Sequence, residues 1–218
     1  MSVRFSNEEF AKLKDLLVVY DWGTKTLMTK LEIIQDDLRD FQDNGAIDYI
    51  RSRIKTPESI AQKLNRLGVP MTSESAKENL RDIAGVRIIT PFARDIYFLA
   101  RLIRSMPDVN VQVEKDYISK PKSSGYRSYH MIVEVPIFFS GKTESVAIEI
   151  QIRTEAMNFW ATLEHKAKYK FSEHVPSHLS DELGAIASKI AELDERMFTI
   201  HELISMINQD VQQDGSKF

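Results

Sequence analysis

The chain has 218 residues, of which 43% are hydrophobic, and its formal net charge is −3. This composition is enough for a folded core and excludes a wholly disordered chain, and the total charge gives no indication of a nucleic-acid coat or a membrane-surface protein. The absence of cysteine excludes a disulfide scaffold, a thiolate zinc site and a Cys nucleophile, and fits a cytoplasmic location. No signal-peptide core opens the chain and no apolar run approaches about 18 residues, so we expect no membrane partner.

The first predicted element is a long helix over residues 7 to 43. Its apolar residues follow one another at alternating three- and four-residue steps from Phe10 to Phe41. We expect Gly23 to bend or split this helix, because glycine costs about 1 kcal/mol relative to alanine there. Gly45, after Asn44, is expected to end it.

Two shorter helices are predicted next. One covers residues 57 to 67 and stops before Gly68. The other begins at Ser75, because Ser75 and Glu78 have the spacing of a capping box, and it ends at Gly85.

From residue 86 the hydrophobic period changes to two, which is typical of strands. The predicted strands cover residues 86–92, 109–118, 126–139 and 146–154, with a helix over 95–106. The last strand is the clearest, because one face is aliphatic and the other carries Glu149, Gln151 and Arg153. Thr154 is then expected to cap a helix over 155–171.

The C-terminal segment has heptad spacing of apolar residues from Leu183 to Ile207, and its last seven residues are expected to fray. We therefore predict an α+β fold with a mixed central β-sheet flanked by long terminal helices. Its parts are a helical segment (1–45), a core (46–175) and a C-terminal helix (176–218). The terminal helices either pack within the chain or form part of an oligomer interface.

Two carboxylates are candidates for chemistry. Glu149 and its neighbours either face water or form the edge of a pocket with the following helix, which carries Asn158, Ala161 and His165. Asp82 is either a surface residue or a partner of Glu149 in a Mg²⁺ site, since Mg²⁺ prefers one or two carboxylates plus substrate phosphates.

Basic residues form two clusters in this acidic chain. One lies at the predicted entry of the second helix and the other precedes residue 128; they comprise Arg51, Arg53, Lys55, Lys63, Arg66, Lys115, Lys120, Lys122 and Arg127. Such runs are commonly solvated faces, but polyphosphate binding or RNA-backbone binding also accounts for them.

The stretch from Ser123 to His130 concentrates rings and hydrogen-bonding groups. On a strand, Tyr126, Ser128 and His130 share a face. The Tyr126 ring, beside Gly125 and Lys122, is suited to stack on a base, although one tyrosine in the core and one exposed is an equally simple arrangement. The chain has no GxxxxGK[ST] or GxGxxG motif, which argues against a P-loop or Rossmann protein.

Four motifs together resemble the synthetase domain of the RelA/SpoT family, most closely its stand-alone members, the small alarmone synthetases. The motifs are RDIAGVRI (81–88), KDYISKPKSSGYRSYH (115–130), VAIEIQIRT (146–154) and MNFWATLEHKAKYK (157–170). The resemblance implies a nucleotidyltransferase-like fold and a GTP pyrophosphokinase of the bacterial stringent response. Such an enzyme transfers the β,γ-pyrophosphate of ATP to the 3′-hydroxyl of GDP or GTP, giving ppGpp or pppGpp and AMP.

The resemblance also implies residue roles and partners. Asp82 and Glu149 correspond to Mg²⁺ ligands, and Glu149 also to the activator of the 3′-hydroxyl. The ATP-binding positions are Arg53, Lys55, Ser59, Lys63, Arg66 and Arg87, with Arg53 and Arg87 on either side of the adenine. The GDP/GTP-binding positions are Lys115, Lys122, Tyr126, His130, Gln151, Asn158 and Ala161, with Tyr126 stacked on the guanine. Family members form homotetramers, and single-stranded RNA or an alarmone is a candidate regulator.

Two other functions stay open at this point. One is an RNA-binding module with the same basic clusters and little catalysis, although the presence of both acids favours an enzyme. The other is a nucleotidyltransferase that adds AMP, which would carry its paired acids in a Gly-Ser motif that is absent here. The chain contains no His-Asp dipeptide of an alarmone hydrolase, so we expect synthesis only.

Overall fold

The computed structural model describes residues 5–40, 45–171 and 175–215, with side chains to residue 207. Its elements, in chain order, are α1 (Asn7–Asp40), β1 (Tyr49–Ile54), α2 (Pro57–Leu67), α3 (Ser73–Asn79), β2 (Ala84–Thr90), α4 (Ala93–Ser105), β3 (Asn110–Asp116), β4 (Tyr129–Phe139), β5 (Lys142–Thr154), α5 (Glu155–Lys170) and α6 (Ser177–Gly215). The α+β class is confirmed. The end of the first predicted helix and Asn44 lie outside the described residues.

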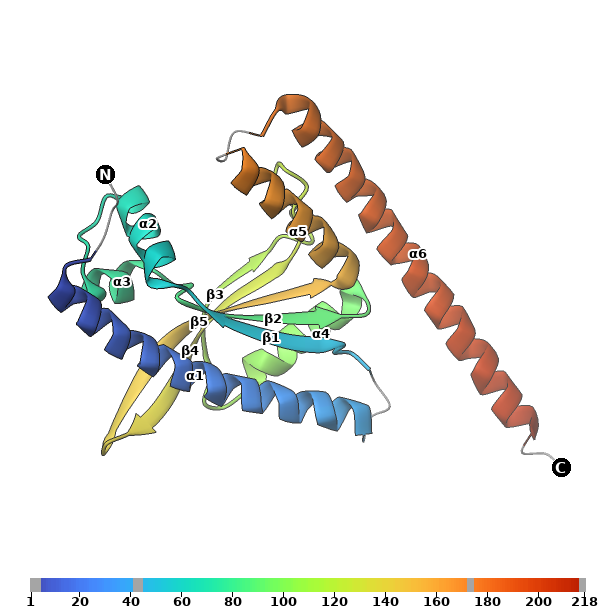
Figure 1. Ribbon diagram of the computed structural model, residues 1–218. Coiled ribbons are helices and arrows are strands. Elements are labelled where there is room, and N and C mark those ends of the chain that lie inside the picture. The colour runs from blue at the N-terminus through green and yellow to red at the C-terminus, as the bar shows by residue number, and fades with distance from the viewer. Residues whose placement is uncertain (1–4, 41–44, 172–174, 216–218) are drawn as a thin grey trace.

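The five strands form one sheet in the order β1-β2-β5-β4-β3. Strands β2 and β5 are parallel, and the other three pairs are antiparallel, so the predicted mixed sheet is confirmed. Strand β5 occupies the centre of the sheet, between β2 and β4 (Figure 1).

One face of the sheet is aliphatic and covered. Ile148, Ile150 and Ile152 of β5 are completely buried and belong to a core shared with α1 and α4. Because side chains alternate along a strand, the intervening polar residues must face the opposite side. Figure 1 shows α1 along one side of the sheet and α5 at the other.

Gly23 does not split α1, so that part of the expectation was wrong. The helix runs unbroken from Asn7 to Asp40. A Cβ atom on Gly23 would come within 2.1 Å of Val146 Cγ2. The glycine is therefore a point of close contact between the helix and β5, a role that helix propensity does not reveal.

Strand β1 was missed, and the third helix was wrongly bounded. Arg51 and Arg53 were placed at a helix entry, but they lie on β1, which pairs with β2. Helix α3 starts after Thr72, whose side chain accepts a hydrogen bond from the Ser75 backbone, and it ends at Asn79. The chain then extends through Leu80 toward β2, so residues near Asp82 are not helical.

Other boundaries shift by a few residues. Strand β4 starts at Tyr129, so Tyr126 precedes it, and β5 begins already at Lys142. The predicted Thr154 cap is confirmed, since its side chain accepts a hydrogen bond from the Met157 backbone.

Helix α6 contacts the rest of the chain from Leu183 as far as Glu202, which lies 3.2 Å from Arg94 of α4. The Trp160 indole donates to the Leu183 carbonyl at 2.8 Å, and Thr154 donates to Asp194 at 2.6 Å. Farther on, the helix extends away from the sheet (Figure 1). The tail expected to fray is helical as far as Gly215. Among the described residues, no helix is long and apolar enough to cross a membrane.

Candidate active site

The polar face of the sheet carries one row of side chains across all five strands. The backbone pairing aligns, in strand order, Arg51, Arg87, Gln151, His130 and Lys115. The adjacent row aligns Arg53, Gly85 and Glu149. Residues far apart in the sequence are thus placed side by side, because alternate residues of every strand face this side.

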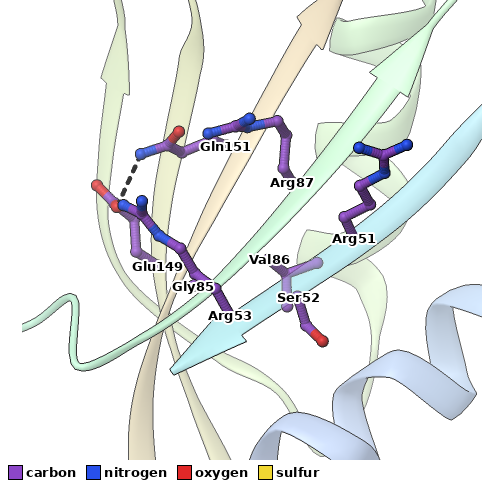
Figure 2. Close-up of a pocket in the computed structure, with 8 residues that line it drawn as sticks. All are labelled: Arg51, Ser52, Arg53, Gly85, Val86, Arg87, Glu149 and Gln151. Carbon is purple, nitrogen blue, oxygen red and sulfur yellow. Dashed lines mark hydrogen bonds between the residues drawn. The ribbon is translucent and has the colours of Figure 1, made fainter. Parts of the chain in front are cut away.

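A cavity of about 230 Å³ opens on this face, lined by Arg51, Ser52, Arg53, Gly85, Val86, Arg87, Glu149 and Gln151 (Figure 2). Gly85 forms its floor. The Arg53 side chain crosses over this glycine, with its Cγ and Nε atoms 3.8 Å from the position of a Cβ. Three arginines and one carboxylate meet here, which is the composition expected for a polyphosphate site.

Glu149 is held from two sides. His130 Nδ1 lies 3.1 Å from Oε1, and the Gln151 amide donates to Oε2 at 2.8 Å (Figure 2). Burial would raise the pKa of Glu149, but its hydrogen bonds with His130 and Gln151 bring it below its usual range. The carboxylate is therefore ionised at neutral pH and its position is fixed.

Asp82 lies just before β2, beside two lysines. Lys63 Nζ is 2.7 Å from Oδ1 and Lys55 Nζ is 3.2 Å from Oδ2. Burial acts to raise the pKa of Asp82, but the two ammonium groups outweigh it and leave the pKa below its usual value. Asp82 in turn raises the pKa of Glu149 through its charge, so the two acids act on one another across the strand ends.

These two acids fit a Mg²⁺ ion that is completed by ligand phosphates. Within the described residues there is no group of three His, Cys, Asp or Glu side chains suited to a metal ion. Mg²⁺ commonly takes one or two carboxylates and obtains its other oxygens from phosphates and water. The donor set therefore matches Mg²⁺ with a nucleotide better than an all-protein metal cage.

The predicted ATP-binding residues divide into two groups. Arg53, Lys55, Lys63 and Arg87 lie at the cavity or at Asp82. Arg87 Nε is buried without a hydrogen-bond partner in the described structure. Ser59 accepts a hydrogen bond from Thr56 at the start of α2, and Arg66 is exposed in the last turn of that helix.

Arg87 is a strong candidate for anion binding. Its Nη1 lies 3.4 Å from the Asn158 oxygen, a weak contact. Burial lowers the pKa of Arg87, and the positive charges of Arg153 and Arg53 add to this effect. A phosphate at the cavity would offset the crowding of positive charge around Arg87.

Tyr126 is more enclosed than its predicted stacking role implies. The ring is only 8% exposed and packs with Trp160, Ala161 and Ala187. Its hydroxyl contacts His130 Nε2 at 2.8 Å and accepts a hydrogen bond from Arg153. Lys122 Nζ lies 4.9 Å from the ring centre.

The other predicted GDP/GTP-binding residues do not all lie against this ring. Lys115 aligns with His130 in the pairing of β3 with β4 but is exposed. Ala161 is buried beside Tyr126, and the Asn158 amide lies 3.4 Å from the Tyr49 hydroxyl. His165, expected on the same side of the helix, is exposed.

Three residues of the site were not among the predicted nucleotide-binding positions. Arg51, predicted only as a member of a basic cluster, lines the cavity. The Tyr117 ring lies 5.3 Å from His130 and 6.1 Å from Tyr126, centre to centre. Arg153 is buried and joins Tyr126 to Gln151. Only the alternation along β5 pointed to Arg153, as a member of the same polar face as Glu149.

Comparison with known proteins accounts for this arrangement. Residues 52–174 match the model described as "Region found in RelA / SpoT proteins". The chain belongs to the RelA/SpoT family. The match contains both acids, the Tyr126 loop and every residue that lines the cavity except Arg51.

Individual RelA/SpoT relatives extend the similarity to most of the chain. GTP pyrophosphokinase YwaC of Bacillus subtilis is 43% identical over 86% of this chain and 89% of its own length. The crystal structure of small alarmone synthetase 1 from Bacillus subtilis bound to its product pppGpp is 35% identical, with a TM-score of 0.82 over 88% of this chain and 98% of that one. A crystal structure of the same synthetase bound to AMPCPP is 32% identical, with a TM-score of 0.75 over 90% and 99%.

Proposed function

We propose that this chain is a GTP pyrophosphokinase that transfers the β,γ-pyrophosphate of ATP to the 3′-hydroxyl of GDP or GTP. The products are ppGpp or pppGpp, and AMP. One observation carries the proposal: a cavity on the polar face of the sheet joins an ionised, fixed carboxylate to three arginines. The relatives named for this activity or bound to its product share the fold and cover nearly the whole chain.

The chemistry assigned to Glu149 is proton transfer. The ribose 3′-oxygen attacks the β-phosphorus of ATP while its proton passes to a Glu149 oxygen. The bond from the β-phosphorus to the oxygen bridging the α- and β-phosphates breaks, and AMP departs with that oxygen. A hydroxyl is a weak nucleophile, so a positioned acceptor for its proton contributes about 10²- to 10⁴-fold to the rate.

The basic residues have an electrostatic role. Lys55, Lys63 and Arg53 supply positive charge and donors for the phosphates of ATP, and Arg87 lies beside them with an unused donor. Asp82 and Glu149 would hold Mg²⁺, which when bound supplies charge neutralisation on the transferring phosphates.

The guanosine substrate is assigned to the side of the site near Tyr126. Lys122 and His130 lie beside this ring, and Gln151 aligns with His130 in the sheet, whereas Asn158 lies on α5 next to Arg87 and Tyr49. Binding of both nucleotides to one face aligns the 3′-hydroxyl with the β-phosphorus. Such alignment accounts for a large part of the rate in reactions between two bound substrates.

The test is a direct assay of both products. The protein is incubated with Mg²⁺, ATP and either GDP or GTP, and the nucleotides are separated by anion exchange. We expect AMP in equal amounts to a more highly charged guanosine nucleotide, and the faster acceptor identifies the preferred substrate. Intact ATP with both acceptors would contradict the proposal, and an RNA mobility shift in the same samples would then favour the RNA-binding module.

We also propose that the protein assembles into a homo-oligomer through α6, as a tetramer by analogy with the family. The apolar stripe on the outer half of this helix is exposed and includes Leu193, Met197, Ile200, Leu203, Ile204 and Ile207. A second copy of the same helix would cover it in a coiled-coil arrangement. Light scattering after size exclusion is expected to give four chains for the wild type and fewer for Ile204→Glu; one chain for the wild type would refute the interface.

The cellular role belongs to the same proposal. A (p)ppGpp synthetase acts in the bacterial stringent response, and the cysteine-free sequence fits a cytoplasmic location. Without a His-Asp dipeptide in the chain, we expect synthesis without hydrolysis. Single-stranded RNA or an alarmone remains our candidate regulator, and adding each to the product assay tests its effect on the rate.

A further inference from the structure

Arg153 is a buried cation with an unusual set of partners. The residue is only 5% exposed. Its guanidinium donates to Tyr126 Oη, to Gln151 Oε1 at 2.7 Å and to Ser128 Oγ at 3.2 Å, all of them neutral acceptors. In the part of the chain that the structure describes, no salt bridge joins Arg153 to a carboxylate. A buried charge with neutral partners is costly, which indicates that its donors hold neighbouring groups in place.

The partners of Arg153 form a closed ring of side chains. On one side, Arg153 donates to Gln151, and Gln151 donates to Glu149 Oε2 at 2.8 Å. On the other side, Arg153 donates to Tyr126, whose hydroxyl lies 2.8 Å from His130 Nε2. His130 Nδ1 then lies 3.1 Å from Glu149 Oε1. Both branches start at the guanidinium and end on the two oxygens of the same carboxylate.

With a neutral His130, the ring has one consistent pattern of donors and acceptors. Arg153 can only donate, and an ionised Glu149 can only accept. Neutral His130 must therefore carry its proton on Nδ1 and accept on Nε2, so the Tyr126 hydroxyl donates to His130 while accepting from Arg153. Every contact in the ring is then satisfied, and the guanidinium fixes the direction of each.

We propose that Arg153 is a positioning residue for the acceptor side of the site. It holds the Tyr126 ring and, through Gln151 and His130, fixes the rotamer and orientation of Glu149. The guanidinium also lies 5.1 Å from the centre of the Tyr126 ring, so it restrains the ring as well as the hydroxyl. This role rests on the proposed function, since that function gives Tyr126 and Glu149 their substrates.

The position of Arg153 separates it from the donor side of the site. Asp82, Lys55 and Lys63 form their own group of ion pairs, and the hydrogen bonds of Arg153 to Ser128, Tyr126 and Gln151 do not reach them. Loss of Arg153 should therefore affect the guanosine nucleotide and the turnover rate and leave ATP binding intact. A general loss of stability would not make this distinction.

The kinetic test uses Arg153→Met, with the exposed Arg101→Met on α4 as the matched control. We expect kcat/KM for GTP to fall on the order of 100-fold in Arg153→Met, as for a misplaced reacting group, with the KM for ATP unchanged and the control like wild type. Arg153→Lys should recover part of the loss, since it restores the charge and one donor. Unchanged kcat/KM for GTP, or a rise in the KM for ATP as large as that for GTP, would overturn the proposal.

A double-mutant cycle tests the connection through the ring. Tyr126→Phe keeps the aromatic face and removes the hydroxyl that joins Arg153 to His130. If the ring acts as one unit, Tyr126→Phe lowers kcat/KM for GTP by a smaller factor in the Arg153→Met background than in the wild type. Fully additive losses would show that the two residues act separately.

A spectroscopic test needs neither turnover nor a folded Arg153 variant. Long-range ¹⁵N–¹H correlation spectra report which ring nitrogen of a histidine carries the proton. The signals of His130 are identified as those that disappear in His130→Asn. We expect the Nδ1–H tautomer in the wild type and its loss of dominance in Tyr126→Phe. The Nε2–H tautomer in the wild type would overturn the ring while leaving the proposed pyrophosphoryl transfer untouched.

Discussion

The two faces of the thirteen-residue strand β5 have opposite roles: one is part of the apolar core and the other lines the candidate site. Ile148, Ile150 and Ile152 are completely buried against α1 and α4. Glu149 and Gln151 alternate with them and line an open cavity. The apolar face supplies the stability that holds the charged face in a crowded arrangement. Substitutions on the polar face should therefore lower the turnover rate, whereas substitutions on the apolar face should lower the free energy of unfolding.

The largest effect is expected for Glu149→Gln on the open face. We expect turnover to fall about 10³-fold, because an amide cannot accept the 3′-hydroxyl proton, while the melting temperature and the Kd for GTP stay close to wild type. Steady-state rates, thermal unfolding and calorimetric titration check these three results. Exposed Glu192→Gln on α6 is the matched control, and wild-type turnover in Glu149→Gln would remove this residue from the mechanism.

The covered face should give the reverse pattern. Ile150→Ala leaves a cavity in the core at the centre of the sheet and is expected to lower the free energy of unfolding by about 2–5 kcal/mol. Below its melting temperature, the variant should keep most of its kcat. Chemical denaturation and the product assay measure the two quantities, and a large loss of kcat with unchanged stability would show that the faces are not separate.

A smaller effect on the same face is expected for Gly23→Ala. The added methyl group would overlap Val146 Cγ2 and push α1 away from β5, at a cost of about 1–3 kcal/mol. Helix propensity alone predicts stabilisation by about 1 kcal/mol. Chemical denaturation therefore distinguishes the two: a lower free energy of unfolding in Gly23→Ala indicates close packing, and a higher one indicates that helix propensity dominates.

The smallest effect concerns pH and stability. Because Glu149 has a lowered pKa in the folded state, its contribution to stability is present above the pKa of an unfolded glutamate, about 4.3, and is lost as the pH falls through the folded value. The unfolding free energy of the wild type should therefore decrease more steeply below about pH 4.3 than that of Glu149→Gln. Parallel curves would mean that the hydrogen bonds of Glu149 do not stabilise its ionised form.

Much of the sheet could be predicted because its strands alternate clearly. The aliphatic positions of β5 and the Thr154 cap depend on local sequence, and both predictions are confirmed. Strand β1 was missed because YIRSRI is short and its charged residues are equally typical of a solvated basic cluster. Only its pairing with β2, formed over a long sequence separation, identifies it as a strand.

The site was predicted by motif, but its connections were not. Register across five strands decides that Arg51, Arg87, Gln151 and His130 lie in one row, and the sequence does not state register. Arg153 shows the same limit. Its residue type and alternation place it on the polar face, whereas its burial under the Tyr126 loop depends on how α5 and α6 pack.

The central claim is that this face transfers a pyrophosphate group, and β-labelled ATP tests it most directly. After incubation with GTP, Mg²⁺ and [β-³²P]ATP, the account predicts label in the guanosine product and none in AMP or ADP. Label in ADP would indicate transfer of the γ-phosphate alone, and label in free pyrophosphate would indicate transfer of AMP. Either of those results would contradict the assignment of this cavity to pyrophosphoryl transfer.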